Sequence, residues 1–182
     1  MRRKINELTI AIIVANGFEE SEMLEPKKAL EKAGAKTVLI SPVKGKVKSW
    51  KSKEWSHDYP VDKLIHEVRA EDFDGLVLPG GVMNPDSLRL EPAVIEFIKA
   101  FIKADKPIAS ICHGPWTLID AEGVRGKKMT SWPSLKKDLT NAGANWMDEE
   151  VVRDGNLITS RKPADLPAFN KAYIALLQER NQ

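Results

Sequence analysis

Cysteine and histidine are scarce in this sequence. Its 182 residues include one cysteine, Cys112, and three histidines. One cysteine excludes an internal disulfide framework and any zinc site built on a pair of cysteines. The histidines form no His-x-x-x-His pattern, so a structural metal site is not expected. We therefore expect a reducing, cytoplasmic setting and no metal or other cofactor.

A strong net charge and long hydrophobic runs are also missing. The formal net charge is +2, which gives no field strong enough to attract nucleic acid or a membrane surface. The apolar run Leu8–Ala15 follows basic residues, as in a signal peptide, but it is too short to span a bilayer. It also breaks at Asn16–Glu20, where no clear small-residue cleavage site follows. The run, rich in Ile and Val, therefore predicts a buried strand.

The composition is that of a globular domain, with 42% apolar and 30% charged residues. Strand and helix patterns alternate along the chain. The expected strands are Leu8–Ala15, Thr37–Ser41, Leu76–Leu78, Pro107–Ile111, Met129–Ser131 and a hairpin within Val151–Thr159. The expected helices are Glu20–Ala33 (with a kink or late start from Pro26), Pro92–Lys103, Pro115–Glu122, one from its cap Ser134 to Ala142, and Pro163–Gln178. The segment Val43–Asp62 is interpreted as an edge hairpin or an extended loop.

This alternation predicts one doubly wound α/β domain with a mostly parallel sheet and helices on both faces. In such folds ligands bind beyond the carboxyl ends of the strands. The candidate site segments are therefore Asn16–Glu22, Gly80–Asp86, Cys112–Pro115 and Ser131–Pro133.

Cys112 is the sharpest candidate. A lone cysteine is ordinarily a small buried hydrophobic residue. Cys112, however, stands between a predicted strand and a helix, on a turn that presents its side chain at the edge of the sheet. The adjacent His113 and the following helix N-terminus favour a thiolate, so we expect a lowered thiol pKa and a reactive cysteine.

Two further groups accompany the thiol. Gly80 and Gly81 follow a strand, where glycine lets backbone N–H groups approach a ligand and form an oxyanion site. Glu19 and Glu22 share a helix face, and either carboxyl could lie beside Cys112 with a raised pKa. The spacing does not choose between these two acids.

The order of the histidines excludes several classes of enzyme. No histidine follows His113, whereas papain-like enzymes, α/β-hydrolases and glutamine amidotransferases need one downstream of the nucleophile. The partner of Cys112 is therefore His113, His57 or His66. His66 lies in a charged stretch and is expected on the surface. His57, near Trp50 and Trp55, is expected in an exposed loop, with a place in a pocket wall as the alternative.

Several motifs in order resemble the ThiJ/PfpI superfamily, with the PfpI-like branch as the closest group. Ala109–Pro115 resembles its nucleophile elbow and Phe73–Gly81 its upstream strand and glycine pair. Further matches are Thr130–Pro133, Asn141–Ala144 and Asp154–Arg161. The pattern covers nearly the whole chain, and only Val43–Asp62 diverges from it.

The resemblance implies a flavodoxin-like fold, with residues 1–182 as a single ThiJ/PfpI-like domain. It implies Cys112 as the nucleophile and His113 as the base, with an oxyanion hole of backbone N–H groups near Gly80, Gly81 and His113. The family acid beside the thiol matches Glu22, with Glu19 as the fallback. Trp116, just after Gly114-Pro115, is expected to narrow the pocket.

The resemblance also implies a homodimer or larger homo-oligomer. In PfpI-like members an acid from the neighbouring subunit orients the histidine, and Asp86 occupies the matching position.

Three functions are compatible with the resemblance. The first is a stress-protective cysteine hydrolase of the deglycase or glyoxalase type, whose thiolate attacks small aldehydes or their protein and peptide adducts. The second is an intracellular cysteine peptidase. The third is a non-enzymatic redox sensor or stress chaperone, in which Cys112 oxidises to a sulfinate stabilised by Glu22.

Overall fold

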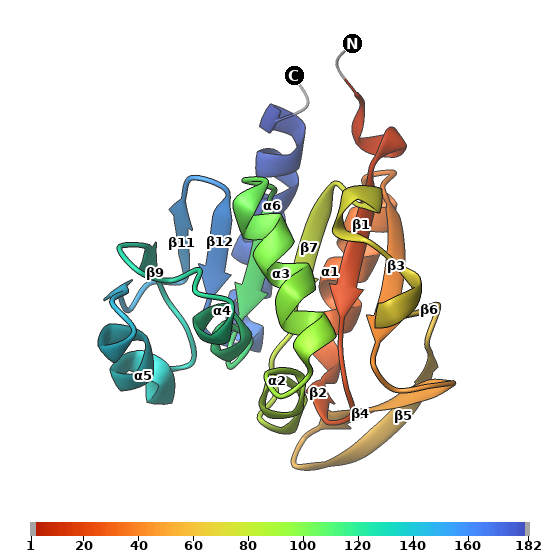
Figure 1. The fold of residues 1–182 in the computed structure, drawn as a ribbon, viewed down its shortest axis with the longest axis horizontal. Coiled ribbons are helices and arrows are strands. Elements are labelled where there is room, and N and C mark those ends of the chain that lie inside the picture. Colours follow the sequence, from red (N-terminus) through yellow and green to blue (C-terminus); the bar gives the residue numbers. More distant parts are fainter. Residues whose placement is uncertain (1–2, 181–182) are drawn as a thin grey trace.

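A mostly parallel sheet of seven strands forms the centre of the protein, in a computed structural model that describes residues 3–180 (Figure 1). The strand order is β11 (Val151–Asp154), β12 (Leu157–Ser160), β8 (Ile108–Ile111), β7 (Gly75–Leu78), β1 (Thr9–Ile13), β3 (Lys36–Ser41) and β6 (Lys63–Leu64). All neighbouring strands in this order are parallel except β11 and β12, which are antiparallel. The predicted fold class is confirmed, and the run at the N-terminus contains a central strand.

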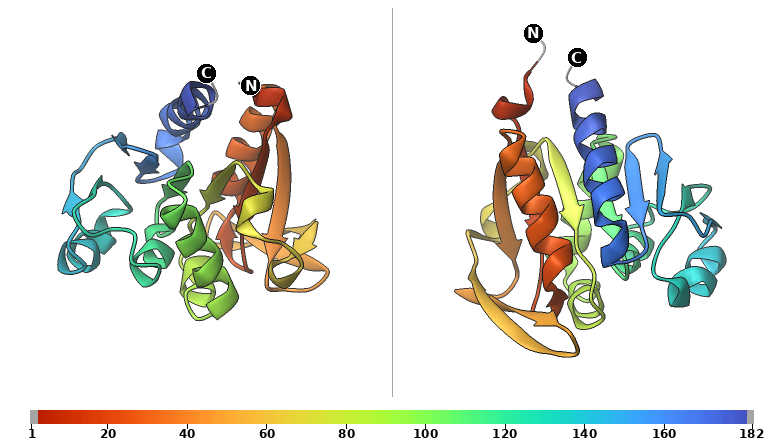
Figure 2. Two further views of the ribbon diagram at one scale, coloured as in Figure 1. Left: turned by 45° about the horizontal axis from the view of Figure 1, so that its top comes forward. Right: turned by 180° about the vertical axis from the view of Figure 1, so that it is seen from behind.

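Helices cover both faces of this sheet, as Figures 1 and 2 show. One face carries α1 (Glu20–Lys32) and α6 (Leu166–Arg180), which pack against each other. The other carries α3 (Pro92–Lys103) and α4 (Pro115–Asp120). Helix α3 buries the face predicted from its 3.6-residue period, which includes Val94, Phe97, Ile98 and Phe101. Because both faces are covered, strands such as β1 are apolar throughout rather than alternating.

The segment Val43–Asp62 contains a hairpin, so the hairpin alternative is confirmed and the loop alternative is wrong. Strands β4 (Lys46–Lys51) and β5 (Glu54–Pro60) pair antiparallel. The hairpin is not an edge of the main sheet, because β4 pairs with β2 (Phe18–Glu19) in a separate three-stranded sheet. Figure 1 shows this small sheet beyond the carboxyl ends of β1 and β3.

Several local expectations are corrected. A short helix, α2 (Met83–Leu88), follows the glycine pair, and Pro85 fits its first turn, where no N–H donor is needed. Helix α1 begins at Glu20 although Pro26 lies inside it, so the late start is wrong. Ser134 is not a helix cap, because a 3-10 turn precedes α5 (Lys136–Asn141). Strand β9 (Lys128–Met129) pairs with β10 (Asn145–Trp146), outside the main sheet.

Short 3-10 turns complete the described chain, at Ile5–Glu7, Ile65–Glu67, Ala70–Asp72 and Pro163–Asp165. Within residues 3–180, every helix is too short or too polar to cross a membrane.

Candidate active site

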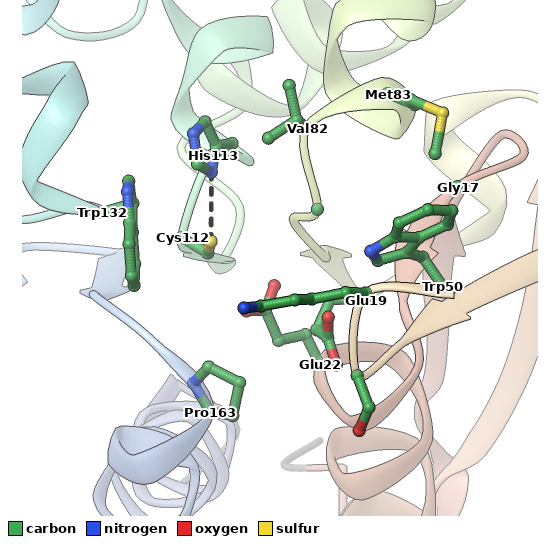
Figure 3. A pocket seen from close by; sticks show the side chains of 13 residues that line it. Gly17, Glu19, Glu22, Trp50, Val82, Met83, Cys112, His113, Trp132 and Pro163 are labelled. Atoms are coloured by element: carbon green, nitrogen blue, oxygen red, sulfur yellow. Dashed lines mark hydrogen bonds between the residues drawn. The ribbon is translucent and has the colours of Figure 1, made fainter. Parts of the chain in front are cut away.

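A pocket of about 550 Å³ opens at the carboxyl ends of the parallel strands (Figure 3). All four candidate segments contribute to it, as the topology predicts. The hairpin and the segment after β12 add further walls. The lining residues are Gly17, Glu19, Glu22, Trp50, Ser52, Lys53, Gly81, Val82, Met83, Cys112, His113, Trp132 and Pro163.

Cys112 lies on a strained turn between β8 and α4. Its backbone has a φ of +61°, in the left-handed region that L-residues rarely adopt. Two backbone hydrogen bonds hold this conformation: the Cys112 N–H donates to the Ser160 carbonyl at 3.1 Å, and the Cys112 carbonyl accepts from the Trp132 N–H at 2.9 Å. The side chain is buried with 7% of its surface exposed, and its Sγ is directed into the pocket. The predicted elbow is therefore present.

His113 is the histidine next to the thiol. Its Nδ1 lies 3.2 Å from the Cys112 Sγ, while its Nε2 lies 3.4 Å from the Ser134 Oγ. Burial lowers the pKa of His113 to about 4. The ring is therefore neutral at pH 7, and an unprotonated Nδ1 can accept the proton of the thiol.

Glu22 is the acid beside the thiol. It is fully buried in the first turn of α1, and its Oε2 accepts the Gly80 N–H at 2.8 Å. Its Oε1 accepts no hydrogen bond from the N–H and O–H groups of residues 3–180, and the carboxyl borders the Cys112 thiol. Burial raises the pKa of Glu22 to about 8. At pH 7 the carboxyl is therefore protonated and can donate its proton to the sulfur.

The expected low pKa of Cys112 is wrong. Burial and the negative charge of an ionised Glu22 raise the pKa of the thiol, and the backbone N–H groups of Gly81 and His113 only partly oppose them. The helix N-terminus and His113 are expected to lower the pKa of the thiol, but the loss of water around the buried sulfur outweighs them. At neutral pH the thiol keeps its proton until a base such as His113 removes it.

Gly80 and Gly81 make different contacts in the site. The Gly80 N–H is occupied by Glu22, so its expected place in the oxyanion hole is wrong. The backbone N–H groups of Gly81 and His113 lower the pKa of the Cys112 thiol, and both residues line the pocket. The Asn84 side chain, buried and unforeseen, fixes this loop by accepting from the Ala15 N–H and donating to the Pro79 and Gly80 carbonyls.

Glu19 also lines the pocket but does not touch the thiol. It is half-buried, and burial raises the pKa of its carboxyl, with a smaller contribution from the charge of Glu20. Its side-chain partner is the Ser21 hydroxyl at 3.5 Å.

Trp116 does not narrow the pocket as expected. It is half-buried behind His113, and its Nε1 donates to Asp138 at 3.0 Å. The ring packs edge-on against His113 at a centroid distance of 5.0 Å. Trp132 narrows the pocket instead, because it lines the wall and its ring stacks on that of His113 at a centroid distance of 6.1 Å.

The remaining candidates lie outside the pocket. Asp86 is exposed on α2 and is not part of the pocket wall of this single chain. His66 is exposed, as expected. His57 is exposed on β5, where its Nδ1 contacts Glu20 at 3.0 Å. No group of three or more His, Cys, Asp or Glu side chains within residues 3–180 is arranged to hold a metal ion.

The sequence analysis assigns no role to several residues of the pocket wall, nor to Ser134 beside His113. Trp132 lies in a candidate segment that received no role, and its position after β9 was the available signal. Ser134, near His113, was interpreted as a helix cap. The hairpin residues Trp50, Ser52 and Lys53 are separated from Cys112 by about 60 residues of chain, and only the folded arrangement places them at the pocket.

Replacing Glu22 by Gln tests the coupling of acid and thiol. Glutamine can accept the Gly80 N–H and donate to the sulfur, but it never carries a negative charge. We expect Glu22→Gln to lower the pH midpoint of thiolate formation by about one unit or more. Thiolate absorbance in the ultraviolet measures this midpoint, with Cys112→Ser as the blank. Glu19→Gln is the matched control and should shift the midpoint less, whereas an unchanged midpoint in Glu22→Gln would refute the coupling.

Replacing Gly80 by Ala tests how tightly the acid and the thiol are packed. A Cβ at Gly80 would lie 2.6 Å from both the Cys112 Cβ and the Glu22 Oε2. We expect Gly80→Ala to lower the free energy of unfolding by about 1–3 kcal/mol, measured with urea. Gly155→Ala is the control, because nothing lies within 4 Å of its Cβ and only its positive φ is strained. Equal stability of Gly80→Ala and the wild type would show that this packing is loose.

Comparisons with known proteins place the chain in a family. The chain is 46% identical over 169 residues to "Putative cysteine protease YraA" of Bacillus subtilis, covering 93% of this chain and 98% of that protein. It is 42% identical over 169 residues to "Protein/nucleic acid deglycase 2" of Escherichia coli, covering 92% and 96%. Among solved structures, Drosophila melanogaster DJ-1beta has a TM-score of 0.84 at 31% identity, covering 96% of this chain and 92% of that chain. The DJ-1/PfpI family model matches residues 8–176, and this chain belongs to that family.

Proposed function

We propose that this protein is a cysteine-dependent hydrolase that acts on small aldehydes or on their protein adducts. The observation that carries the proposal is the Cys112 thiol on its strained turn, with the Nδ1 of a neutral His113 ring at 3.2 Å. A nucleophile within hydrogen-bond reach of a base is the arrangement that nucleophilic catalysis needs. The name of the deglycase relative supports the substrate class.

The first step is addition of the thiol to the aldehyde carbonyl of a 2-oxoaldehyde. As the sulfur–carbon bond forms, His113 Nδ1 takes the thiol proton. The carbonyl π bond breaks and its electrons go to oxygen, which faces the N–H groups of Gly81 and His113. His113 then returns the proton to this oxygen, which gives a hemithioacetal.

The second stage releases the product. His113 removes the proton from the former aldehyde carbon while the ketone oxygen gains a proton, which gives an enediol. His113 then returns its proton to the former ketone carbon while the hydroxyl on the sulfur-bearing carbon loses its proton, and this leaves a thioester of a 2-hydroxy acid. Water then cleaves the thioester, which gives the 2-hydroxy acid and the free thiol. The net reaction adds one water molecule and needs no oxidant or reductant. Throughout, the protonated Glu22 carboxyl lies against the sulfur and stabilises its negative charge when the thiolate leaves.

A peptidase is the alternative enzyme, supported by the name of the Bacillus subtilis relative. The thiol is 7% exposed and lies at the base of a pocket that includes Trp50 and Trp132. This depth favours a small substrate over an extended peptide. A redox sensor, in which a peroxide oxidises Cys112 to a sulfinate beside Glu22, is the non-enzymatic alternative.

Conversion of methylglyoxal to lactate tests the proposal. We expect the wild type to form lactate and Cys112→Ala to form none, because the chain has no second thiol. His113→Ala should lower the rate by at least about 10²-fold, as for other general bases. His66→Ala, at an exposed histidine outside the pocket, is the matched control and should retain the activity. Lactate formation by Cys112→Ala would refute the mechanism, and cleavage of casein fragments without lactate formation would favour the peptidase.

We further propose that the site is completed in a homodimer by Asp86 of the neighbouring subunit. Asp86 is exposed on α2, next to Val82 and Met83, which line the pocket with 55% and 38% of their surfaces exposed. Leu90, just beyond this helix, is 79% exposed. A two-fold contact over this apolar face would bring the partner's acid towards His113, whose Nε2 lies 3.4 Å from the Ser134 hydroxyl.

Complementation between inactive subunits tests this arrangement. We expect Asp86→Ala to lower activity by up to about 10⁴-fold, which is the effect of losing the orienting aspartate in a serine protease. The variant should still form the dimer. Mixing Asp86→Ala with Cys112→Ala should restore activity after subunit exchange, because each heterodimer regains one intact site. Confirmed exchange without recovery would place Asp86 outside the partner's site.

A further inference from the structure

A buried carboxylate anchors the β4–β5 hairpin to the beginning of α1. Glu20 is 5% exposed, and its Oε2 accepts hydrogen bonds from the Ser49 hydroxyl at 2.7 Å and the His57 Nδ1 at 3.0 Å. The Lys51 Nζ lies 3.4 Å from its Oε1. Although burial opposes ionisation, these hydrogen bonds keep the pKa of Glu20 well below its ordinary value. The hairpin is therefore fixed to the helix that carries Glu22.

The anchored hairpin presents its tip to the pocket. Trp50, Ser52 and Lys53 line the wall, and the positive φ values of Ser52 (+51°) and Lys53 (+69°) make the tight turn. Trp50 packs edge-on against Trp55, with ring centroids 5.4 Å apart. Figure 3 shows Trp50 and Trp132 on opposite sides of the pocket, with Cys112 between them. A flat apolar group reaching the thiol would pass between two indole rings.

Lys53 has an unusual electrostatic position in this wall. Glu22 and His113 are neutral at pH 7, because burial raises the pKa of the first to about 8 and lowers that of the second to about 4. Glu19, on the α1 side, is the other group that can carry charge, and burial raises its pKa. Lys53 has no ion-pair partner within 4.0 Å in the part of the chain that the structure describes. The wall thus offers an uncompensated ammonium group beside apolar surface.

We propose that Lys53 binds the carboxylate of a substrate whose apolar body lies between Trp50 and Trp132. The substrate class is then an apolar organic anion with a reactive carbonyl, rather than a neutral aldehyde alone. The carboxylate points towards the hairpin, away from Glu19, and the carbonyl points towards Cys112. Only the reactive carbonyl rests on the proposed function; the anion site rests on the hairpin wall.

Binding to Cys112→Ala separates this proposal from catalysis. The probes are 4-acetylbenzoate and its uncharged counterpart 4-acetylbenzamide, measured by calorimetry. We expect the anion to bind about two- to fivefold more tightly than the amide, the effect of one partly exposed charge pair. Adding Lys53→Met, which keeps the length of the side chain, should abolish this preference. Lys48→Met, an exposed lysine of β4 outside the pocket, is the matched control and should preserve it.

Three results would overturn the proposal: equal affinity for the two probes, an equal loss of preference in Lys48→Met, or no binding of either probe. Turnover of 4-carboxyphenylglyoxal and phenylglyoxal by the protein with Cys112 intact gives the second readout. There Lys53→Met should raise KM for the anion alone and leave kcat unchanged. Selective binding without any turnover would refute the proposed hydrolase and leave the anion site standing.

Discussion

A left-handed backbone at Cys112 turns the chain from the end of β8 towards α4 and directs the thiol into the pocket. Such a conformation is unfavourable by about 1–3 kcal/mol and persists only where its surroundings enforce it. Here the carbonyl of Ser160 and the N–H of Trp132 hold the two sides of the residue. The turn also needs close neighbours without side chains: a Cβ at Gly114 would lie 2.5 Å from the Leu78 carbonyl. The positions of the Cys112 thiol and the adjacent His113 ring follow from this turn.

Loss of water explains the protonation states around the thiol. Burial keeps Glu22 protonated, His113 unprotonated and the thiol in its neutral form. The resting site is therefore a set of neutral groups rather than a thiolate–imidazolium pair. In the proposed reaction, negative charge develops on the carbonyl oxygen, near the N–H groups of Gly81 and His113. The thiol must therefore lose its proton as the sulfur attacks.

The sequence predicts the sheet, most of its helices and the edge at which the site lies, because these follow from hydrophobic periodicity and parallel-strand topology. It also brings Cys112 and His113 together, since they are adjacent. It does not predict that the Gly80 N–H binds Glu22, or that Trp132 and not Trp116 borders the pocket, because these depend on tertiary distances of a few ångströms. The sequence does not predict helix α2, because its six residues are too few to show a hydrophobic period of 3.6 residues.

The wall that contains Trp50 and Lys53 belongs to the small sheet of β2, β4 and β5, whereas the nucleophile and base follow a strand of the main sheet. The same segment, Val43–Asp62, is the one that the sequence motifs predict to depart from the family pattern. A protein with this division can change its substrate range during evolution by altering one hairpin, while the strained turn and its proton-transfer groups stay intact. Members of one family can then differ in substrate through the hairpin alone, while the nucleophile and its proton-transfer partner stay the same.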